Sequence, residues 1–271
     1  MERIITHESC LEKGKLGLEE KRLDNVRISF VLRTRFRNFA GRQKLGVAWM
    51  VIDPIVTSII YLFVFTVIRS NPSPESLFIG LTLMKILSSS IRSGVDAVSD
   101  FSGGIVAERV RTRVLVLSSF YYRIIDNSLQ SVGVALILLI FFKVDSTGVL
   151  AFILISQIIG ILGEGFGLNL ASLARRIPDF RNFVNYFLLL LFYGSPALYP
   201  MSVTTGIHYR INEFNPYSYF AESARYFAGL DSVILDLDWK IFASMVAILI
   251  LLTFRGYSGI DGLRWKVTTW P

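Results

Sequence analysis

The sequence has few of the side chains that metal sites and disulfides require. Its 271 residues include a single cysteine, Cys10, and two histidines, His7 and His208. One cysteine excludes an intrachain disulfide, and these residues supply too few ligands for a structural zinc site. We therefore expect neither a disulfide framework, nor a metal, nor a cofactor.

Nucleotide-binding and hydrolytic motifs are also missing. No Gly-x-x-x-x-Gly-Lys-Ser/Thr sequence occurs, because Gly14-Lys15 is followed by leucine and preceded by no suitable glycine. Ser-x-x-Lys and His-Glu-x-x-His are absent as well. The chain is therefore not expected to be an enzyme, and ATP hydrolysis that drives it would take place on a separate partner subunit.

Charge is scarce and hydrophobic residues are abundant. Charged residues make up 18% of the chain and hydrophobic residues 52%, with a mean hydropathy of +0.52. Apolar runs of nearly twenty residues recur, which is the length that a helix needs to cross a bilayer. The sequence predicts an all-α integral membrane protein. The first run begins near Leu45 behind a charged segment, so no cleavable signal peptide is expected.

Six transmembrane helices are predicted within residues 45–271. They cover about 45–68, 77–98, 120–142, 148–174, 183–199 and 237–254. The first is expected to break at Asp53-Pro54, with the aspartate capping the restarted helix. Inner segments hold 21 lysines and arginines when Arg123, near the start of the third span, is included, and outer segments hold five, so both termini are expected in the cytoplasm. This asymmetry accounts for the net charge of +7 without nucleic acid.

Two amphipathic segments are predicted on the cytoplasmic side. Residues 1–26 form a polar tail, and residues 27–44 form a helix whose apolar face is Ile28, Leu32, Phe36 and Phe39. Arginines on its other faces favour a position among membrane lipid headgroups, and the alternative is a helix packed on protein. The amphipathic pattern of Asp100 to Ser119 predicts a second, short surface helix between the second and third spans.

The segment after the fifth span is too polar to cross a bilayer and too apolar for a free loop. Because hydrocarbon offers no partners for backbone amides, it must fold back on the protein or line a wet cavity. Proline ends helices, so we expect two short helices separated at Asn215-Pro216. We interpret the segment as an outer gate, formed by Pro196, Tyr199, Pro200, Asn215 and Pro216.

Polar and ionisable side chains fall inside the predicted spans. Lys85, Arg92 and Glu164 are costly there and are expected to face the bundle or water. Arg92 and Glu164 lie at matching depths, so we expect an ion pair between them. Gly163 and Gly167, one turn apart, indicate close helix packing.

A face that mixes hydroxyl groups with aromatic rings predicts a pathway for sugars. The residues assigned to this lining are Ser58, Tyr61, Phe65, Tyr186 and Tyr193. Helix packing together with an interfacial aromatic belt explains the first three equally well.

The order of these motifs resembles the permease subunit of type-2 ABC exporters of polysaccharides, such as O-antigen, capsule and teichoic acid exporters. The resemblance covers most of the chain from Arg27 onward. It is carried by the basic helix, Leu45-Gly46-Val47-Ala48-Trp49, Asp53-Pro54, Ser195-Pro196 to Tyr199-Pro200, and Asn215-Pro216 ahead of Arg225.

The resemblance implies a homodimer that works with ATP-binding cassette ATPase subunits and moves lipid-linked glycan across the cytoplasmic membrane. Asp100 to Ser119 then matches the coupling helix, and the residues assigned to ATPase contact are Glu108, Arg109, Arg111 and Arg113. The chain departs from the family's usual pattern at Arg111-Thr112-Arg113, where an aromatic–proline pair is common. It also departs at Arg176-Ile177-Pro178-Asp179, where an Arg-Asp pair is usual, and at Lys85, near a frequent tryptophan. The alternatives are a type-2 ABC permease for another lipid or a drug, and an ATP-independent channel or membrane scaffold.

Overall fold

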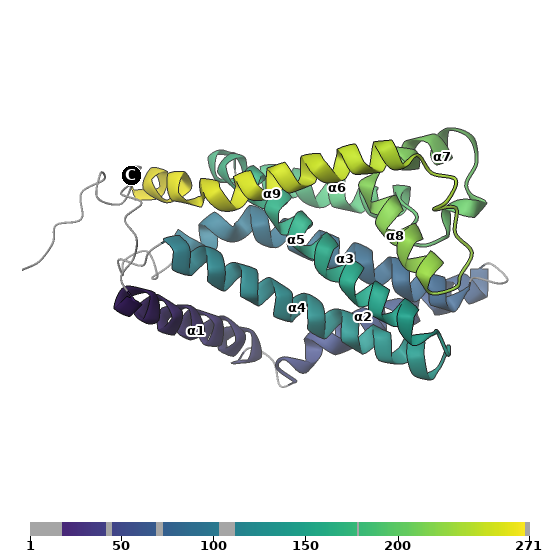
Figure 1. Ribbon diagram of the computed structural model, residues 1–271, viewed down its shortest axis with the longest axis horizontal. Coiled ribbons are helices and arrows are strands. Elements are labelled where there is room, and N and C mark those ends of the chain that lie inside the picture. Colours follow the sequence, from purple (N-terminus) through teal and green to yellow (C-terminus); the bar gives the residue numbers. More distant parts are fainter. Residues whose placement is uncertain (1–17, 42–44, 69–72, 103–111, 178, 269–271) are drawn as a thin grey trace, which may run out of the picture.

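A computed structural model of the chain describes residues 18–41, 45–68, 73–102, 112–177 and 179–268, and all regular structure in these ranges is helical. The helices pack lengthwise into a bundle, with α1 towards one end and α7 and α8 at the other (Figure 1). The α-helices are α1 (Leu18–Gly41), α2 (Ala48–Ile68), α3 (Pro74–Ser102), α4 (Thr112–Ile140), α5 (Ser146–Arg176), α6 (Phe180–Gly194), α7 (Gly206–Glu213), α8 (Pro216–Phe227) and α9 (Trp239–Thr268). A 3₁₀ turn, Met201–Val203, lies between α6 and α7.

Within the described ranges, three helices have the length and apolar composition to cross a membrane. These stretches are Leu117–Ile140 in α4, Ser146–Ala174 in α5 and Trp239–Gly259 in α9, and Ala48–Val64 in α2 is a shorter apolar helix. The prediction of an all-helical membrane protein is thus supported, while the count of six spans stays a prediction. Of the helices without such a stretch, α3 carries buried polar residues such as Ser76, Thr82 and Ser90 because it runs through the centre of the bundle.

Glycines let α3 and α5 approach closely. A Cβ atom added at Gly167 would overlap the Ile91 carbonyl oxygen, and one at Gly94 would overlap the Glu164 carbonyl oxygen. At Gly163 the same atom would lie 3.0 Å from the Leu87 side chain. The close packing predicted for Gly163 and Gly167 is therefore confirmed.

We expect Gly167→Ala to lower the stability of the bundle. Even one methyl group requires α5 to move away from the α3 backbone, and overpacking of this kind costs about 1–3 kcal/mol. The melting temperature of the purified protein in lipid nanodiscs measures the effect. Gly259→Ala is the matched control, because Gly259 is an exposed residue of α9 with open space around it. Equal melting temperatures for the two variants would refute the packing role.

The structure corrects the predicted limits of the basic helix. α1 begins at Leu18, within the segment predicted as a polar tail. Ile28 and Val31 are buried against Val114 of α4, so this face packs on protein. Leu23, Val26 and Phe30 are exposed, and they form a second apolar face that remains available to a membrane.

The break predicted at Asp53-Pro54 is wrong, because α2 continues through Pro54. Proline removes only one backbone donor, and the turn that follows is reinforced by hydroxyl groups. Thr57 donates to the Asp53 carbonyl at 2.7 Å, and Ser58 donates to the Pro54 carbonyl at 2.8 Å. The Asp53 carboxylate forms an ion pair with Lys85 of α3 rather than capping a helix.

Three other boundaries differ from the predicted spans. The part of the expected surface helix from Thr112 onward is the start of α4, continuous with the third span. α6 ends at Gly194, and its 15 residues extend about 22 Å, less than the roughly 30 Å of a hydrocarbon core. α9 has 30 residues, so the last span is longer than predicted.

Candidate functional site

The segment between α6 and α9 contains two short helices, α7 and α8, that meet at Asn215-Pro216 as predicted. Asn215 is the N-cap of α8, and its side-chain oxygen accepts a hydrogen bond from the Tyr217 backbone N–H at 3.1 Å. Pro216 takes the first helical position, where a backbone donor has no intrahelical partner to lose. These two residues fix the start of α8.

A buried ion pair joins α8 to the surrounding elements. Glu222 and Arg225 have no exposed side-chain surface, and Arg225 Nη1 donates to Glu222 Oε1 at 2.8 Å. Arg225 also donates to the Ser76 hydroxyl of α3 and to the Pro196 carbonyl, each at 2.8 Å. Opposite charges together with several hydrogen bonds offset the cost of burying both ions.

The Glu222 carboxylate holds the flanking turns. It accepts the Met201 backbone N–H at 2.9 Å and the Val233 backbone N–H at 3.1 Å. The Glu222–Arg225 pair therefore connects α3, the turn after α6, the 3₁₀ turn and the loop before α9. We call α8, the turn after α6, the 3₁₀ turn and the loop before α9 together the α8 cap.

The α8 cap also rests directly on the backbone of α3. The Tyr217 hydroxyl donates to the Gly80 carbonyl at 2.7 Å. Burial raises the pKa of Tyr217, so this hydroxyl remains a neutral donor. A side chain at Gly80 would overlap the Ala197 carbonyl oxygen. The glycine thus permits the close contact between α3 and the turn after α6.

A second buried polar cluster lies among α4, α5 and α9. Arg123 of α4 is 2% exposed and donates to Asp126 at 2.9 Å. Its guanidinium also lies 3.7 Å from the Glu164 carboxylate of α5. Glu164 accepts hydrogen bonds from the Ser119 hydroxyl at 2.6 Å and the Tyr257 hydroxyl at 2.9 Å.

The predicted ion pair between Arg92 and Glu164 is therefore wrong. Glu164 points towards α4 and α9, where Arg123 is its cationic partner, while Arg92 lies on the exposed side of α3. Sequence reasoning did not single out Arg123, which lies inside α4. Its spacing of three from Asp126 is the sequence signal that could have placed it in a buried pair.

Charges of alternating sign extend from the exposed Asp53 carboxylate to the buried cluster. Lys85 of α3 pairs with Asp53 of α2 and interacts electrostatically with Asp126, which in turn pairs with Arg123. With Glu164 as the last member, each charge has a neighbour of opposite sign. Such pairing allows ionisable groups to remain within an apolar helix bundle.

Comparison with known families identifies the domain in which these features lie. Residues 27–228 match the ABC-2 type transporter family, and the match includes α3 and the α8 cap up to Arg225. The chain belongs to this family. No curated protein matches it. Membership of the ABC-2 family makes the chain a membrane permease of a transporter, and the family implies an ATPase partner.

The gate residues predicted for this ABC-2 permease are gathered around the α8 cap. The Pro196 carbonyl belongs to the hydrogen-bond network, and the Tyr199 hydroxyl lies 2.8 Å from His208 Nε2. Pro200 immediately precedes the 3₁₀ turn. Sequence reasoning missed Glu222, although opposite charges three residues apart in an aromatic segment are a readable signal. The gate role stays a prediction.

The predicted pathway residues occupy different environments. Ser58 is fully buried, with its hydroxyl bonded within α2, so it lines no exposed surface of this chain. Tyr61 is half-buried against Phe192, with ring centroids 5.5 Å apart. Tyr186 and Tyr193 of α6 are 72% and 58% exposed. Phe65 belongs to α2, and its side chain falls outside the described part of the structure.

Most of the predicted coupling residues fall outside the described ranges. These residues are Glu108, Arg109 and Arg111. Arg113 lies in the first turn of α4, and its side chain is likewise outside the description. Contact between these residues and the ATPase stays a prediction.

Proposed function

We propose that this ABC-2 permease is the membrane subunit of an ATP-driven exporter of polysaccharide or lipid-linked glycan. The observation that carries the proposal is an exposed aromatic strip along α6, formed by Phe183, Tyr186 and Tyr193. The spacings of three and seven residues place these side chains on one face of the helix. Rings with hydroxyl groups give a surface along which sugars can stack and slide.

A homodimer would enclose this strip. α2 exposes Ile59, Ile60 and Phe63, and it is linked to α6 through the contact of Tyr61 with Phe192. Together the two helices present a large apolar surface, which is typical of a protein or membrane interface. A second copy on this surface would place two aromatic strips opposite each other, as a conduit requires.

The two ends of the bundle suit separate tasks. Gly80, near the start of α3, contacts the α8 cap, and α3 ends at Ser102, about 33 Å further along the helix axis. α3 therefore ends at the far end of the bundle, where the start of α4 packs on α1 (Figure 1). We assign that end to the cytoplasm and the ATPase, and the α8 cap to the outer side.

Charge reversal in the connection from α3 to α4 tests this assignment. We expect Arg109→Glu to weaken binding to the ATPase subunit at least tenfold, about 1.4 kcal/mol. The substitution places a negative charge on a surface that is predicted to be basic. The amount of ATPase subunit that co-purifies with the permease from membranes measures the effect. Resistance of the permease to extraction by alkaline carbonate checks that it is inserted in the membrane. Arg210→Glu is the control, since Arg210 is exposed on α7 at the other end. Equal ATPase recovery for both variants would count against coupling at this site.

The cargo is tested with the reconstituted complex. Undecaprenyl- or dolichyl-linked glycan should stimulate ATP hydrolysis and become accessible on the far side of the vesicle membrane. Stimulation by a drug or simple lipid alone would favour the other ABC-2 cargo. Movement of glycan without ATP would indicate a channel and refute ATP-driven export.

A further inference from the structure

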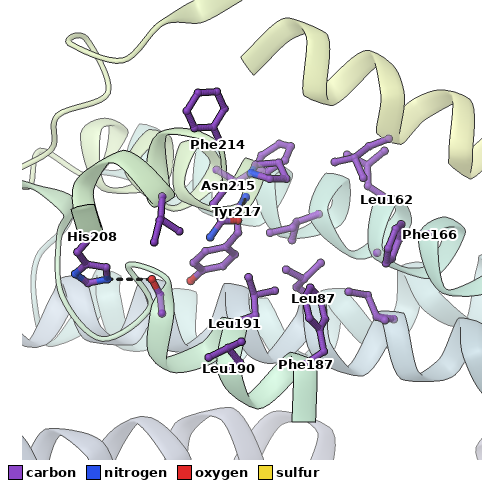
Figure 2. Close-up of a pocket in the computed structure, with 18 residues that line it drawn as sticks. Leu87, Leu162, Phe166, Phe187, Leu190, Leu191, His208, Phe214, Asn215 and Tyr217 are labelled. Atoms are coloured by element: carbon purple, nitrogen blue, oxygen red, sulfur yellow. Dashed lines mark hydrogen bonds between the residues drawn. The ribbon is translucent and has the colours of Figure 1, made fainter. Parts of the chain in front are cut away.

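A large apolar cavity lies next to the α8 cap, between α3, α5 and α6 (Figure 2). Its volume of about 770 Å³ is within the range of pockets that hold small organic ligands. Leucine, isoleucine and phenylalanine side chains form most of its lining, among them Leu87, Leu162, Phe166 and Leu191. The lining thus offers many contacts to hydrocarbon.

The polar groups that reach the cavity already have partners. The Tyr217 hydroxyl donates to the backbone of α3, and the Asn215 side-chain oxygen accepts the Tyr217 N–H. His208 Nε2 lies 3.1 Å from the Gly194 carbonyl oxygen and 2.8 Å from the Tyr199 hydroxyl. His208 stands at one end of the cavity, away from Leu162 and Phe166 (Figure 2). The deeper part therefore favours a ligand without hydrogen-bonding groups.

The cavity opens beside α6 and α7. Leu190 lines it and is 71% exposed, and Phe187, Ile211 and Phe214 are lining residues that are also exposed. Leu190 lies about one helical turn from Tyr186 and from Tyr193, so the opening adjoins the aromatic strip. Because these lining residues are apolar, a hydrocarbon chain can enter the opening without passing a charged group.

We propose that this cavity binds the hydrocarbon chain of a lipid, either acyl or isoprenoid. Lining residues from Ile159 to Phe166 extend over about 10 Å of α5, so a chain lying parallel to the helices contacts two turns. Water finds few partners in such a site, and an empty apolar cavity reduces stability as its volume grows. The inference rests on the proposed function in one respect. If the permease exports lipid-linked glycan, the bound hydrocarbon is the tail of the glycan carrier, and its sugars pass the adjoining aromatic strip.

Gly194→Phe is designed to obstruct the opening of the cavity, because Gly194 ends α6 and its carbonyl contacts His208 of α7. Gly194 belongs to the lining, yet a Cβ atom added there would have no neighbour within 4 Å. The start of the new side chain therefore meets no neighbouring atom, and the Gly194 carbonyl keeps its hydrogen bonds. Gly259→Phe is the matched control, because it adds the same ring at a glycine that also has open space around it but does not line the cavity. Equal melting temperatures of the two variants establish that both are folded.

Photo-crosslinking in nanodiscs reads out occupancy. Lipids carrying a diazirine near the end of an acyl or isoprenoid chain should label Leu162, Phe166 and Leu191, and Gly194→Phe should reduce this labelling at least fivefold relative to Gly259→Phe. Labelling confined to the exposed α5 residues Leu154 and Ile158 would overturn the proposal, because it reports only surrounding lipid. So would crosslinks from a second copy of the chain inside the cavity, or labelling that Gly194→Phe leaves unchanged.

The experiment needs no ATPase, which separates it from the test of export. Labelling of the cavity in a permease that moves no glycan supports the lipid site and refutes the exporter. ATP-driven glycan movement without labelling of the cavity supports the exporter and refutes the lipid site.

Discussion

Arg225→Ala is expected to lower the free energy of unfolding by about 3–5 kcal/mol, because it leaves a buried carboxylate without its cation. Glu222 has no exposed surface, and its partner also supplies the hydrogen bonds to Ser76 and Pro196. Losing Arg225 therefore removes the bonds that tie α8 to Ser76 and to the turn after α6, and leaves the Tyr217 hydroxyl as the hydrogen bond from α8 to α3. Thermal melting in nanodiscs measures the loss, and limited proteolysis should cut first within residues 195–235.

Arg210→Ala provides the comparison for this variant, since Arg210 is an exposed arginine in the same segment. It should melt like the unaltered protein. The double variant Glu222→Met with Arg225→Met should be more stable than Arg225→Ala, because removing both charges leaves no ion unpaired. If Arg225→Ala melts like Arg210→Ala, the ion pair does not hold the α8 cap together.

The second large effect is expected at Arg123→Gln. The substitution leaves the carboxylates of Asp126 and Glu164 buried near each other without their shared arginine. Breaking a buried charge network in this way costs about 3–5 kcal/mol. We expect a sharp fall in the amount of protein recovered from membranes and a lower melting temperature in what remains.

Two further variants make the Arg123 prediction specific. Arg255→Gln removes an exposed arginine from α9 and should leave the yield unchanged. Adding Asp126→Asn and Glu164→Gln to Arg123→Gln should restore much of the yield, because no buried charge is then unpaired. A triple variant that behaves no better than Arg123→Gln would show that the loss has another cause.

The helices of this fold are largely readable from sequence, because each apolar run is long and proline marks the α7–α8 junction. The errors concern places where local signals compete with packing. Pro54 predicted a break, yet α2 gains enough from hydroxyl bonds and from the contact of Asp53 with Lys85 to continue. α6 was predicted to extend to Tyr199, although it stops at Gly194 where the chain turns under α8.

The polar partners were harder to predict than the helices. The depth of Glu164 was a sound guide to its being paired, but depth alone does not say which of its neighbours it faces. That choice depends on the rotation of α5, which is set by Gly163 and Gly167 packing on α3. Glu222 and Arg225 differ from Glu164. Their separation of three residues predicts that the two side chains can pair, but nothing in the sequence shows that the pair is buried.

The composition of the α8 cap has a consequence for biosynthesis. Ser76 and Arg225, which bond directly, are 149 residues apart in the chain, and the cap also needs Val233. A ribosome therefore delivers α3 to the membrane long before its final neighbours exist, and the cap closes only after Val233 has been made. A chain whose synthesis stops before Val233 would be left with an unmatched polar surface that proteases can recognise.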